Sequence, residues 1–377
     1  MILFSTQCFP PDIGGIETLI GSAADRLSKS GASVTVLADP IRSDRPEWAF
    51  PFPVRRFGGF KPIRRWLKSR HIRQMANSSL VSILIADSWK SLEYVGDLKI
   101  PIVTFAHGNE LQEDPNSTKG QRIKAALARA NHCIANSHFT ADLLKKFGVA
   151  DLKISIFHPP VEPQATATPD ALANIDQRLH TQGPILATVA RLEPRKGIDD
   201  VIVALPELIK TYPDLIYAIG GGGDDRPRLE ALSQQLGVGE HVVFLGRVND
   251  AERAALLTRA TIFVMPTREI GHSVEGFGIS YIEAGWYGVP SIASVVGGGV
   301  DAVLNGKTGL CIDRNRKGDL ARAIGLLLDD ESMRREMGLA AAHRAQHELC
   351  WDFAITRLDA IIENVLRKHA ATNIEAA

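Results

Sequence analysis

Short apolar strands alternate with helical patterns along the whole chain, and this alternation limits the possible folds more than any other feature. Runs such as Ile102–Ala106 and Ile262–Pro266 have the length of buried strands, and amphipathic stretches such as Ile198–Thr211 separate them. Parallel strands need a crossover connection, which a helix supplies. The sequence therefore predicts an α/β protein built from doubly wound parallel sheets.

The length of the chain predicts more than one domain. With 377 residues it exceeds what one ordinary hydrophobic core accommodates. A stretch rich in proline, alanine and threonine from His158 to about Gln182 is the best linker candidate. We expect one domain over residues 1–165, a second over 180–350, and a last helix of about 352–377 that crosses back onto the first. Ligands of open α/β sheets bind at the carboxyl ends of the strands, which predicts a site in the cleft between the sheets.

Composition excludes several classes of protein. The apolar content of 45% and charged content of 23% are those of a soluble globular protein. Four cysteines lie far apart and form no CxxC, which argues against a zinc site or a disulfide framework and fits a reducing cytosol. No run of 18 apolar residues is present, and the first residues resemble a strand rather than a signal peptide. These features predict a cytoplasmic protein.

One segment departs from the neutral overall charge. Between Arg55 and Arg73 there are eight arginines or lysines and no acid, interleaved with aromatic and aliphatic residues. Such a segment is typical of contact with an anionic membrane surface. A solvated basic helix with an ordinary core face explains it equally well, and a nucleic-acid patch is a weaker alternative. We keep the peripheral membrane contact as a hypothesis and expect no nucleic-acid partner.

The segment from Glu275 to Glu283 is the strongest candidate for a binding site. Gly276, Phe277 and Gly278 come between Glu275 and a predicted helix, and glycines leave room for a ligand to approach the backbone. Free N–H groups at the helix start favour an anion, and a carboxylate such as Glu283 suits a vicinal diol. The segment is therefore interpreted as a clamp for a nucleotide sugar, although a buried helix with two solvated glutamates would look similar.

Basic residues after another strand fit the same interpretation. Arg191 ends the predicted strand Ile185–Ala190, and Arg195 and Lys196 precede the next helix. Cations at a helix N-terminus are unfavourable unless an anion is bound there. A diphosphate held by Arg191 and Lys196 accounts for them, and exposed basic residues in a loop are the alternative.

Further candidates follow other strand ends. Gly14 and Gly15 can present N–H groups to an anion, although a plain strand-to-helix turn explains them about as well. Gly222 lies in a run of four glycines, which need close approach either by a ligand or by the chain's own backbone. The backbone near Val248 can pair with a base edge, and a tight structural turn is an equal alternative. His107 and Asn136 end two strands of the first half. No acidic pair forms a DxD motif, so we predict no metal site and no cofactor.

Taken in order, these pieces resemble the retaining glycosyltransferases of family 4, also called glycosyl transferases group 1, over nearly the whole chain. The resemblance rests on Gly14-Gly15-x-Glu17, His107-Gly108, Asn136-Ser137, Arg191 with Lys196, Gly220–Gly223, Glu275 with Glu283, and the terminal Trp351-Asp352 helix. It includes Gly297-Gly298-x-x-Asp301, where the family more often has glutamate. The resemblance implies the GT-B fold, with two Rossmann-like domains and a donor site mostly in the second.

The resemblance also implies roles. Arg191 and Lys196 would bind the donor diphosphate, Glu283 the ribose, and Glu275 with the backbone of residues 276–278 the sugar. His107 would lie near that sugar, and Gly14-Gly15 would close on the phosphates. GDP-mannose and UDP-linked hexoses are both common donors in the family, and a glycan or lipid-linked hydroxyl is the expected acceptor. A glycoside hydrolase using two glutamates, a nucleotide-sugar epimerase and an inactive nucleotide-sugar-binding protein remain as alternatives.

Overall fold

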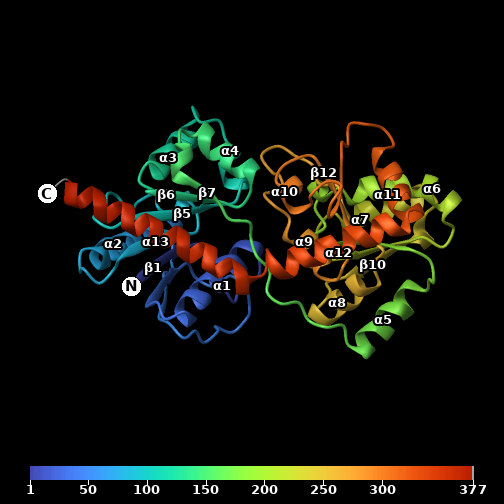
Figure 1. Cartoon of the computed structure of the whole chain (residues 1–377), viewed down its shortest axis with the longest axis horizontal. Coiled ribbons are helices and arrows are strands. Elements are labelled where there is room, and N and C mark those ends of the chain that lie inside the picture. Colours follow the sequence, from blue (N-terminus) through green and yellow to red (C-terminus); the bar gives the residue numbers. More distant parts are fainter. Residues whose placement is uncertain (376–377) are drawn as a thin grey trace. The chain divides into compact units, whose positions relative to one another are not determined.

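The computed structural model describes residues 1–375, which form two compact units (Figure 1). The first unit consists of residues 1–159 together with the chain from Trp351 onward, and the second of residues 160–350. The chain therefore leaves the first unit near Pro159 and returns to it in its last helix, α13 (Trp351–Glu375).

The first unit is built on a seven-stranded sheet in which every paired strand is parallel. Its spatial order is β3-β2-β1-β4-β5-β6-β7. The strands are β1 (Ile2–Thr6), β2 (Val34–Ala38), β3 (Val54–Arg56), β4 (Ile83–Ala86), β5 (Ile102–Ala106), β6 (His132–Ala135) and β7 (Ile154–Ile156).

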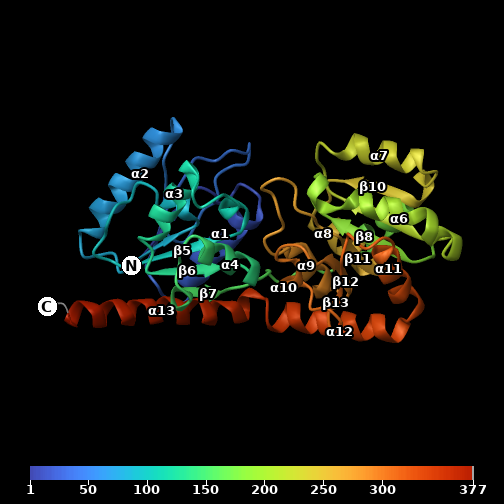
Figure 2. The same cartoon turned by 90° about the horizontal axis from the view of Figure 1, so that it is seen from above.

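Helices cover both faces of this sheet. Successive side chains of a strand point to opposite faces, so each strand contributes to the packing on both. Leu3 and Phe4, neighbours in β1, belong to different hydrophobic clusters. One cluster includes residues of α2, α3 and α4, and the other includes residues of α1 and α13. These helices are α1 (Gly15–Lys29), α2 (Lys61–Ala76), α3 (Thr118–Leu127) and α4 (His138–Lys146). Figure 2 shows α13 running along the first unit, where Asp352 binds Arg26 of α1.

The second unit repeats this design with a six-stranded parallel sheet in the order β10-β9-β8-β11-β12-β13. Its strands are β8 (Ile185–Val189), β9 (Ile216–Gly220), β10 (Val242–Gly246), β11 (Ile262–Met265), β12 (Ser291–Ser294) and β13 (Gly309–Ile312). Its helices are α5 (Pro169–Leu179), α6 (Ile198–Thr211), α7 (Arg226–Gln235), α8 (Asp250–Arg259), α9 (Ile279–Trp286), α10 (Gly299–Ala302), α11 (Asp319–Asp329) and α12 (Glu331–His347). Leu186 and Ala187 of β8 again face two different clusters.

Strand order reverses once in each sheet. In the first unit the chain winds outward from β1 to β3 and then restarts at β4 on the other side of β1. In the second unit it winds from β8 to β10 and restarts at β11. The carboxyl ends of β1 with β4, and of β8 with β11, are therefore the two topological switch points where doubly wound folds bind ligands.

Two local expectations were wrong. The linker candidate contains helix α5, which begins with Thr168 as its N-cap and buries Ile175 and Leu179. Strand β3 was missed because only one of its three residues, Val54, is apolar. No helix within residues 1–375 is both long enough and apolar enough to cross a bilayer.

Candidate active site

The switch point of the second unit brings two loops together at the ends of β8 and β11. The loop after β8 contains a short 3₁₀ helix, Pro194–Lys196, and then Gly197 with φ of +71°. A Cβ atom at Gly197 would lie 2.1 Å from the carbonyl oxygen of Pro266, directly after β11. Glycine is thus required there, and it lets the cation-bearing loop lie against the end of β11. The Arg268 N–H, which donates to the Arg195 carbonyl oxygen at 2.8 Å, ties the two loops together.

The second loop brings Glu275 onto the cations of the first. Lys196 Nζ donates to Glu275 Oε2, and Arg195 donates to the same oxygen through Nη1 at 2.9 Å. The backbone of Glu275 is fixed as well, because its carbonyl oxygen accepts from the Gly298 N–H at 2.8 Å. The structure therefore brings together Lys196 and Glu275, which the sequence predicted from separate motifs, and it adds Arg195.

Arg191 reaches the same group through a second carboxylate. Its Nη1 lies 3.0 Å from Glu193 Oε1, while Arg195 Nε donates to Glu193 Oε2 at 2.9 Å. Arg191 is the most exposed member, with 76% of its side chain accessible, whereas Arg195 and Lys196 each have 11%. Five side chains of alternating charge therefore form a continuous row: Arg191, Glu193, Arg195, Glu275 and Lys196.

Burial and the neighbouring charges shift the pKa values of Glu275 and Lys196 in opposite directions. Burial alone would raise the pKa of Glu275, but the positive charges of Lys196 and Arg195 hold that pKa below its ordinary value. Burial lowers the pKa of Lys196, and Glu275 opposes this effect. Glu275 is therefore a carboxylate at neutral pH, and its charge depends on its two cationic partners.

Residues 276–278 form a tight turn into α9. Gly278, with φ of +96°, is the residue before the helix, and no side chain caps the helix start. The Phe277 side chain is buried in the core, so only its backbone can face a ligand. The role predicted for the backbone of this turn stays a prediction.

Glu283 lies inside α9 and is paired loosely. Arg253 of α8 approaches its Oε1 to 3.6 Å. Burial raises the pKa of Glu283, the charge of Arg253 lowers it, and Asp250 adds a smaller upward effect. Among residues 1–375, the Glu283 carboxylate thus lacks a close cation of the kind that Glu275 has. No sequence signal links Arg253 with Glu283, since the two residues come from different helices.

The glycine run after β9 is explained largely by chain packing. A Cβ atom at Gly221, where φ is +144°, would lie 1.8 Å from the Ala190 carbonyl oxygen. Gly222, the predicted donor-binding residue, would meet only the Arg247 side chain, at 3.4 Å. Val248 packs against the core beside β9. Of the two explanations that the sequence left open, close approach of backbone to backbone accounts for Gly221.

The first unit places its predicted residues at neighbouring strand ends. His107 follows β5, and its carbonyl oxygen accepts from the Asn136 side chain, which follows β6, at 3.1 Å. His107 Nε2 lies 2.8 Å from the carbonyl oxygen of Asp87, an acceptor only, so a neutral imidazole carries its proton on Nε2 and its lone pair on Nδ1. Asp87, at the end of β4, was not predicted. It is buried and accepts from the Gln7 N–H at 2.6 Å.

The glycine turn before α1 is partly filled by its own chain. A Cβ atom at Gly14 would lie 2.2 Å from Glu17 Oε2, so the Glu17 carboxylate sits against the start of the helix. Helix α1 begins at Gly15 without a side-chain cap. The predicted anion position at Gly14 and Gly15 is therefore next to a carboxylate of the same turn.

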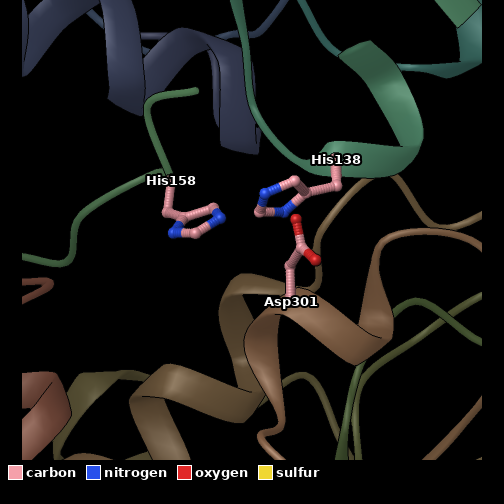
Figure 3. A group of neighbouring side chains, drawn as sticks. All are labelled: His138, His158 and Asp301. Carbon is pink, nitrogen blue, oxygen red and sulfur yellow. The ribbon is translucent and has the colours of Figure 1, made fainter. Parts of the chain in front are cut away.

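Two histidines of the first unit lie near each other. Figure 3 shows His138 at the start of α4 and His158 on the segment after β7, and their ring centroids are 6.2 Å apart. Asp301, also labelled in Figure 3, belongs to α10 of the second unit. A protein zinc site takes three or four ligands, and these two imidazoles supply two. That the protein uses no metal stays a prediction.

The basic segment differs from its expected arrangement. Arg64 and Lys68 bind the two oxygens of Asp39, each at 2.8 Å, and Arg65 binds Glu93 at 3.0 Å. These side chains therefore point toward the body of the first unit. The side chains that α2 and the preceding residue expose are mostly apolar: Phe60, Ile63, Trp66 and Leu67. The idea that the whole basic run faces a membrane is wrong for Arg64, Arg65 and Lys68.

Comparisons with known proteins match both halves of the chain. The family model described as "Glycosyl transferases group 1" matches residues 173–344, and "Glycosyltransferase Family 4" matches residues 13–165. A D-inositol 3-phosphate glycosyltransferase of Corynebacterium aurimucosum is 30% identical over 311 residues, which cover 77% of this chain and 70% of that protein.

A second relative matches over a shorter range. A GDP-mannose-dependent alpha-(1-6)-phosphatidylinositol monomannoside mannosyltransferase of Mycolicibacterium smegmatis is 41% identical over 186 residues. This match spans 48% of the chain and 49% of that relative. Among solved structures, a sucrose-phosphate synthase from Thermosynechococcus elongatus superposes with a TM-score of 0.78 at 20% identity, covering 97% of this chain and 99% of that one. At this identity the likeness shows the fold alone, which is GT-B, with two Rossmann-like domains, as predicted.

Proposed function

Because the chain belongs to glycosyltransferase family 4, the glycosyl transferases group 1, we propose that it transfers a hexosyl group from a nucleotide-diphosphate sugar to an acceptor hydroxyl with retention of configuration. The observation that carries this proposal is the row of charges at the second switch point. Two cations lie on one loop of this row: Arg191, which contacts Glu193, and Lys196, which contacts Glu275. Such a group suits a diphosphate leaving group attached to a sugar.

The chemistry needs one bond exchange. The bond between the anomeric carbon and the donor phosphate oxygen breaks, and the acceptor hydroxyl attacks the same face of the sugar. A phosphate oxygen of the departing nucleoside diphosphate takes the hydroxyl proton. Arg191 and Lys196 stabilise the charge that develops on the diphosphate, which is electrostatic catalysis without a protein nucleophile or a metal.

Other residues position the donor. Glu275 and the backbone of residues 276–278 hold the sugar, Glu283 binds the ribose diol, and His107 lies near the sugar. Gly14, Gly15 and Asn136 of the first unit, with Gly222 and Val248 of the second, complete the donor contacts. We favour GDP-mannose as the donor because the relative from Mycolicibacterium smegmatis is described as GDP-mannose-dependent.

Nucleotide binding and donor turnover together test this function. Binding of a nucleotide to the native state raises its stability, so a thermal-shift comparison of GDP with UDP identifies the base. Incubation with labelled GDP-mannose and no acceptor should release GDP slowly. Tight binding without any release would indicate an inactive binding protein, and epimerised sugar nucleotide would indicate an epimerase. Failure to bind either nucleotide would overturn the proposal.

We also propose a lipid or lipid-linked acceptor, reached by a protein that docks peripherally on an anionic bilayer. Phe60 is 73% exposed and Trp66 48%, and Ile63 and Leu67 lie on the same exposed face of α2. Lys61 and Arg70 are exposed beside them, and no acid occurs between residues 55 and 73. Aromatic and aliphatic side chains flanked by cations fit the lipid interface. In this proposal the apolar face inserts and the few outward cations add attraction.

Vesicle binding distinguishes insertion from charge attraction. The paired variant Ile63→Ser with Trp66→Ser should lose most binding to phosphatidylglycerol-containing vesicles, whereas Arg64→Gln should keep it because Arg64 is bound to Asp39. Absence of wild-type binding at low salt would refute the membrane contact. Loss of binding in Arg64→Gln, with binding retained by the Ile63/Trp66 variant, would point to charge rather than insertion.

A further inference from the structure

The two cations proposed for the diphosphate are already engaged by carboxylates in this structure. Arg191 contacts Glu193 at 3.0 Å, and Lys196 contacts Glu275. A diphosphate must compete with these carboxylates for the two cations. A displaced carboxylate then needs another cation, above all Glu275, whose side chain is only 14% exposed, because a buried charge that loses its partner is costly.

Arg195 is the one side chain that contacts both of these carboxylates among residues 1–375. Its Nε donates to Glu193 Oε2 and its Nη1 to Glu275 Oε2, both at 2.9 Å. A guanidinium has five N–H donors in a fixed planar fork, so it can hold two carboxylates at once. Lysine, with a compact ammonium group on a flexible stem, does not share this geometry.

The backbone around Arg195 is held independently of any ligand. The Arg195 carbonyl oxygen accepts from the Arg268 N–H at 2.8 Å, and Arg268 Nε donates to the Pro194 carbonyl oxygen at 2.7 Å. Asp199, in the first turn of α6, holds the Arg268 guanidinium at 2.6 Å. Arg195 can therefore stay in place while its neighbours in the row change partners.

We propose that Arg195 is a positioning residue, which retains Glu193 and Glu275 when a diphosphate takes over Arg191 and Lys196. This inference rests on the proposed function, since it assumes that the row receives a diphosphate. The row carries three positive and two negative side chains, so it has one positive charge in excess. Without Arg195, Glu193 would stay bound to Arg191 and Glu275 to Lys196, so these two cations would be less available to a diphosphate.

Binding of GDP, measured by calorimetry, tests the inference without requiring turnover. Arg195→Gln should weaken GDP binding about 10-fold, the scale of one charge-assisted hydrogen bond. The decisive variant is Arg195→Gln combined with Glu275→Gln. Its GDP affinity should be clearly higher than that of Arg195→Gln alone, because no carboxylate then competes for Lys196, while Glu193 still competes for Arg191.

A purely structural role for Arg195 predicts a different pattern. In that case removal of Glu275 would add to the loss of affinity rather than reverse it, and the inference would be overturned. Arg195→Lys should recover only part of the affinity. Arg259→Gln is a matched control, because it breaks an exposed ion pair with Asp176 elsewhere in the second unit and should leave GDP binding unchanged.

The outcome separates this inference from the proposed function. If the wild type binds GDP and releases it from GDP-mannose while Arg195→Gln binds GDP within twofold of the wild type, only the inference fails. If the variants behave as expected but no donor is turned over, the transferase assignment fails and the positioning role stands. If UDP is the nucleotide bound, the same series is measured with UDP. Failure of the wild type to bind either nucleotide overturns both.

Discussion

Each unit buries one lysine against a carboxylate at the carboxyl ends of its strands, yet the two pairs differ in what completes them. In the first unit, Lys68 Nζ donates to Asp39 at 2.8 Å and to the Thr6 carbonyl oxygen at 2.7 Å. Arg64 binds the other oxygen of Asp39 at 2.8 Å. Both side chains of the Lys68–Asp39 pair are almost completely buried. This pair is closed, because each partner has a second contact within the same unit.

The pair of the second unit is open by comparison. Among residues 1–375, Lys196 Nζ meets only Glu275, although an ammonium group has three donors. Glu275 has a second cation in Arg195 and can keep its charge satisfied when Lys196 turns elsewhere. The same residue types thus serve two purposes. A closed pair fixes α2 to the sheet, and an open pair leaves a lysine able to exchange its partner for a ligand.

The largest expected effect is on stability, from breaking the closed pair. Lys68→Met should lower the free energy of unfolding of the first unit by about 3–5 kcal/mol, because Asp39 loses a buried partner. Urea unfolding followed by tryptophan fluorescence reports mainly this unit, which holds four of the five tryptophans. GDP affinity of the folded variant should equal that of the wild type. A loss of GDP affinity without a loss of stability would show that the Lys68–Asp39 pair serves ligand binding rather than the fold.

Breaking the open pair should affect catalysis instead. Lys196→Ala should lower turnover of GDP-mannose by about 100-fold or more, by analogy with the loss of other donors that stabilise an oxyanion. Steady-state kinetics with GDP-mannose measure the effect, and Lys307→Ala, which removes an exposed lysine of the same unit, is the control. A near-normal rate for Lys196→Ala would remove the basis for assigning it to the leaving group.

Substitutions of the two glutamates, Glu275 and Glu283, should affect different kinetic parameters. Glu275→Ala should reduce mainly turnover if its carboxylate meets the sugar, as we propose. Glu283→Ala should weaken donor binding about 10-fold, the scale of the one charged hydrogen bond that we propose it makes to the ribose. Initial rates over a range of donor concentrations separate kcat from KM. If both variants changed only KM, the assignment of Glu275 to the reacting sugar would be wrong.

The fold and the individual candidate site residues could be predicted from the sequence because both leave local patterns in it. Strands such as β5 were recognised from apolar runs, and Lys196 and Glu275 from the residues beside them. Helix α5 was missed, although Thr168 before Pro169 is a recognised helix start, because its composition resembles a linker. The local signals therefore succeeded where composition and pattern agreed.

Long-range pairs left no such signal. Arg195 and Glu275 are 80 residues apart, and the contact depends on the two loops that meet at the switch point. The same applies to Arg253 with Glu283, and to the inward turn of Arg64 toward Asp39. A count of charges along the chain does not show which of these residues are neutralised internally, because only the fold decides that.

The smallest expected effect is the pH dependence of stability, in which the two glutamates have opposite signs. The pKa of Glu275 is held below its ordinary value of 4.5, so the unfolded chain binds more protons than the native state just below pH 4.5. Glu275 therefore adds stability above that pH, and the stability is lost as the pH falls through its lowered native pKa. The pKa of Glu283 is raised, chiefly by burial, so the native state binds more protons above pH 4.5 and stability falls as the pH rises through this range.

Substitution by glutamine removes each titration without changing the shape of the side chain. Glu283→Gln should unfold at a higher urea concentration than the wild type at pH 7, and this gain should shrink toward pH 4.5. Glu275→Gln should be less stable than the wild type at pH 7, because Lys196 and Arg195 lose their carboxylate, and the difference should narrow only below pH 4.5. A loss of stability in Glu283→Gln at pH 7 would show that Arg253, at 3.6 Å, stabilises the Glu283 carboxylate by more than its burial costs. In that case the distinction between an open pair rich in cations and a loosely paired ribose carboxylate would fail.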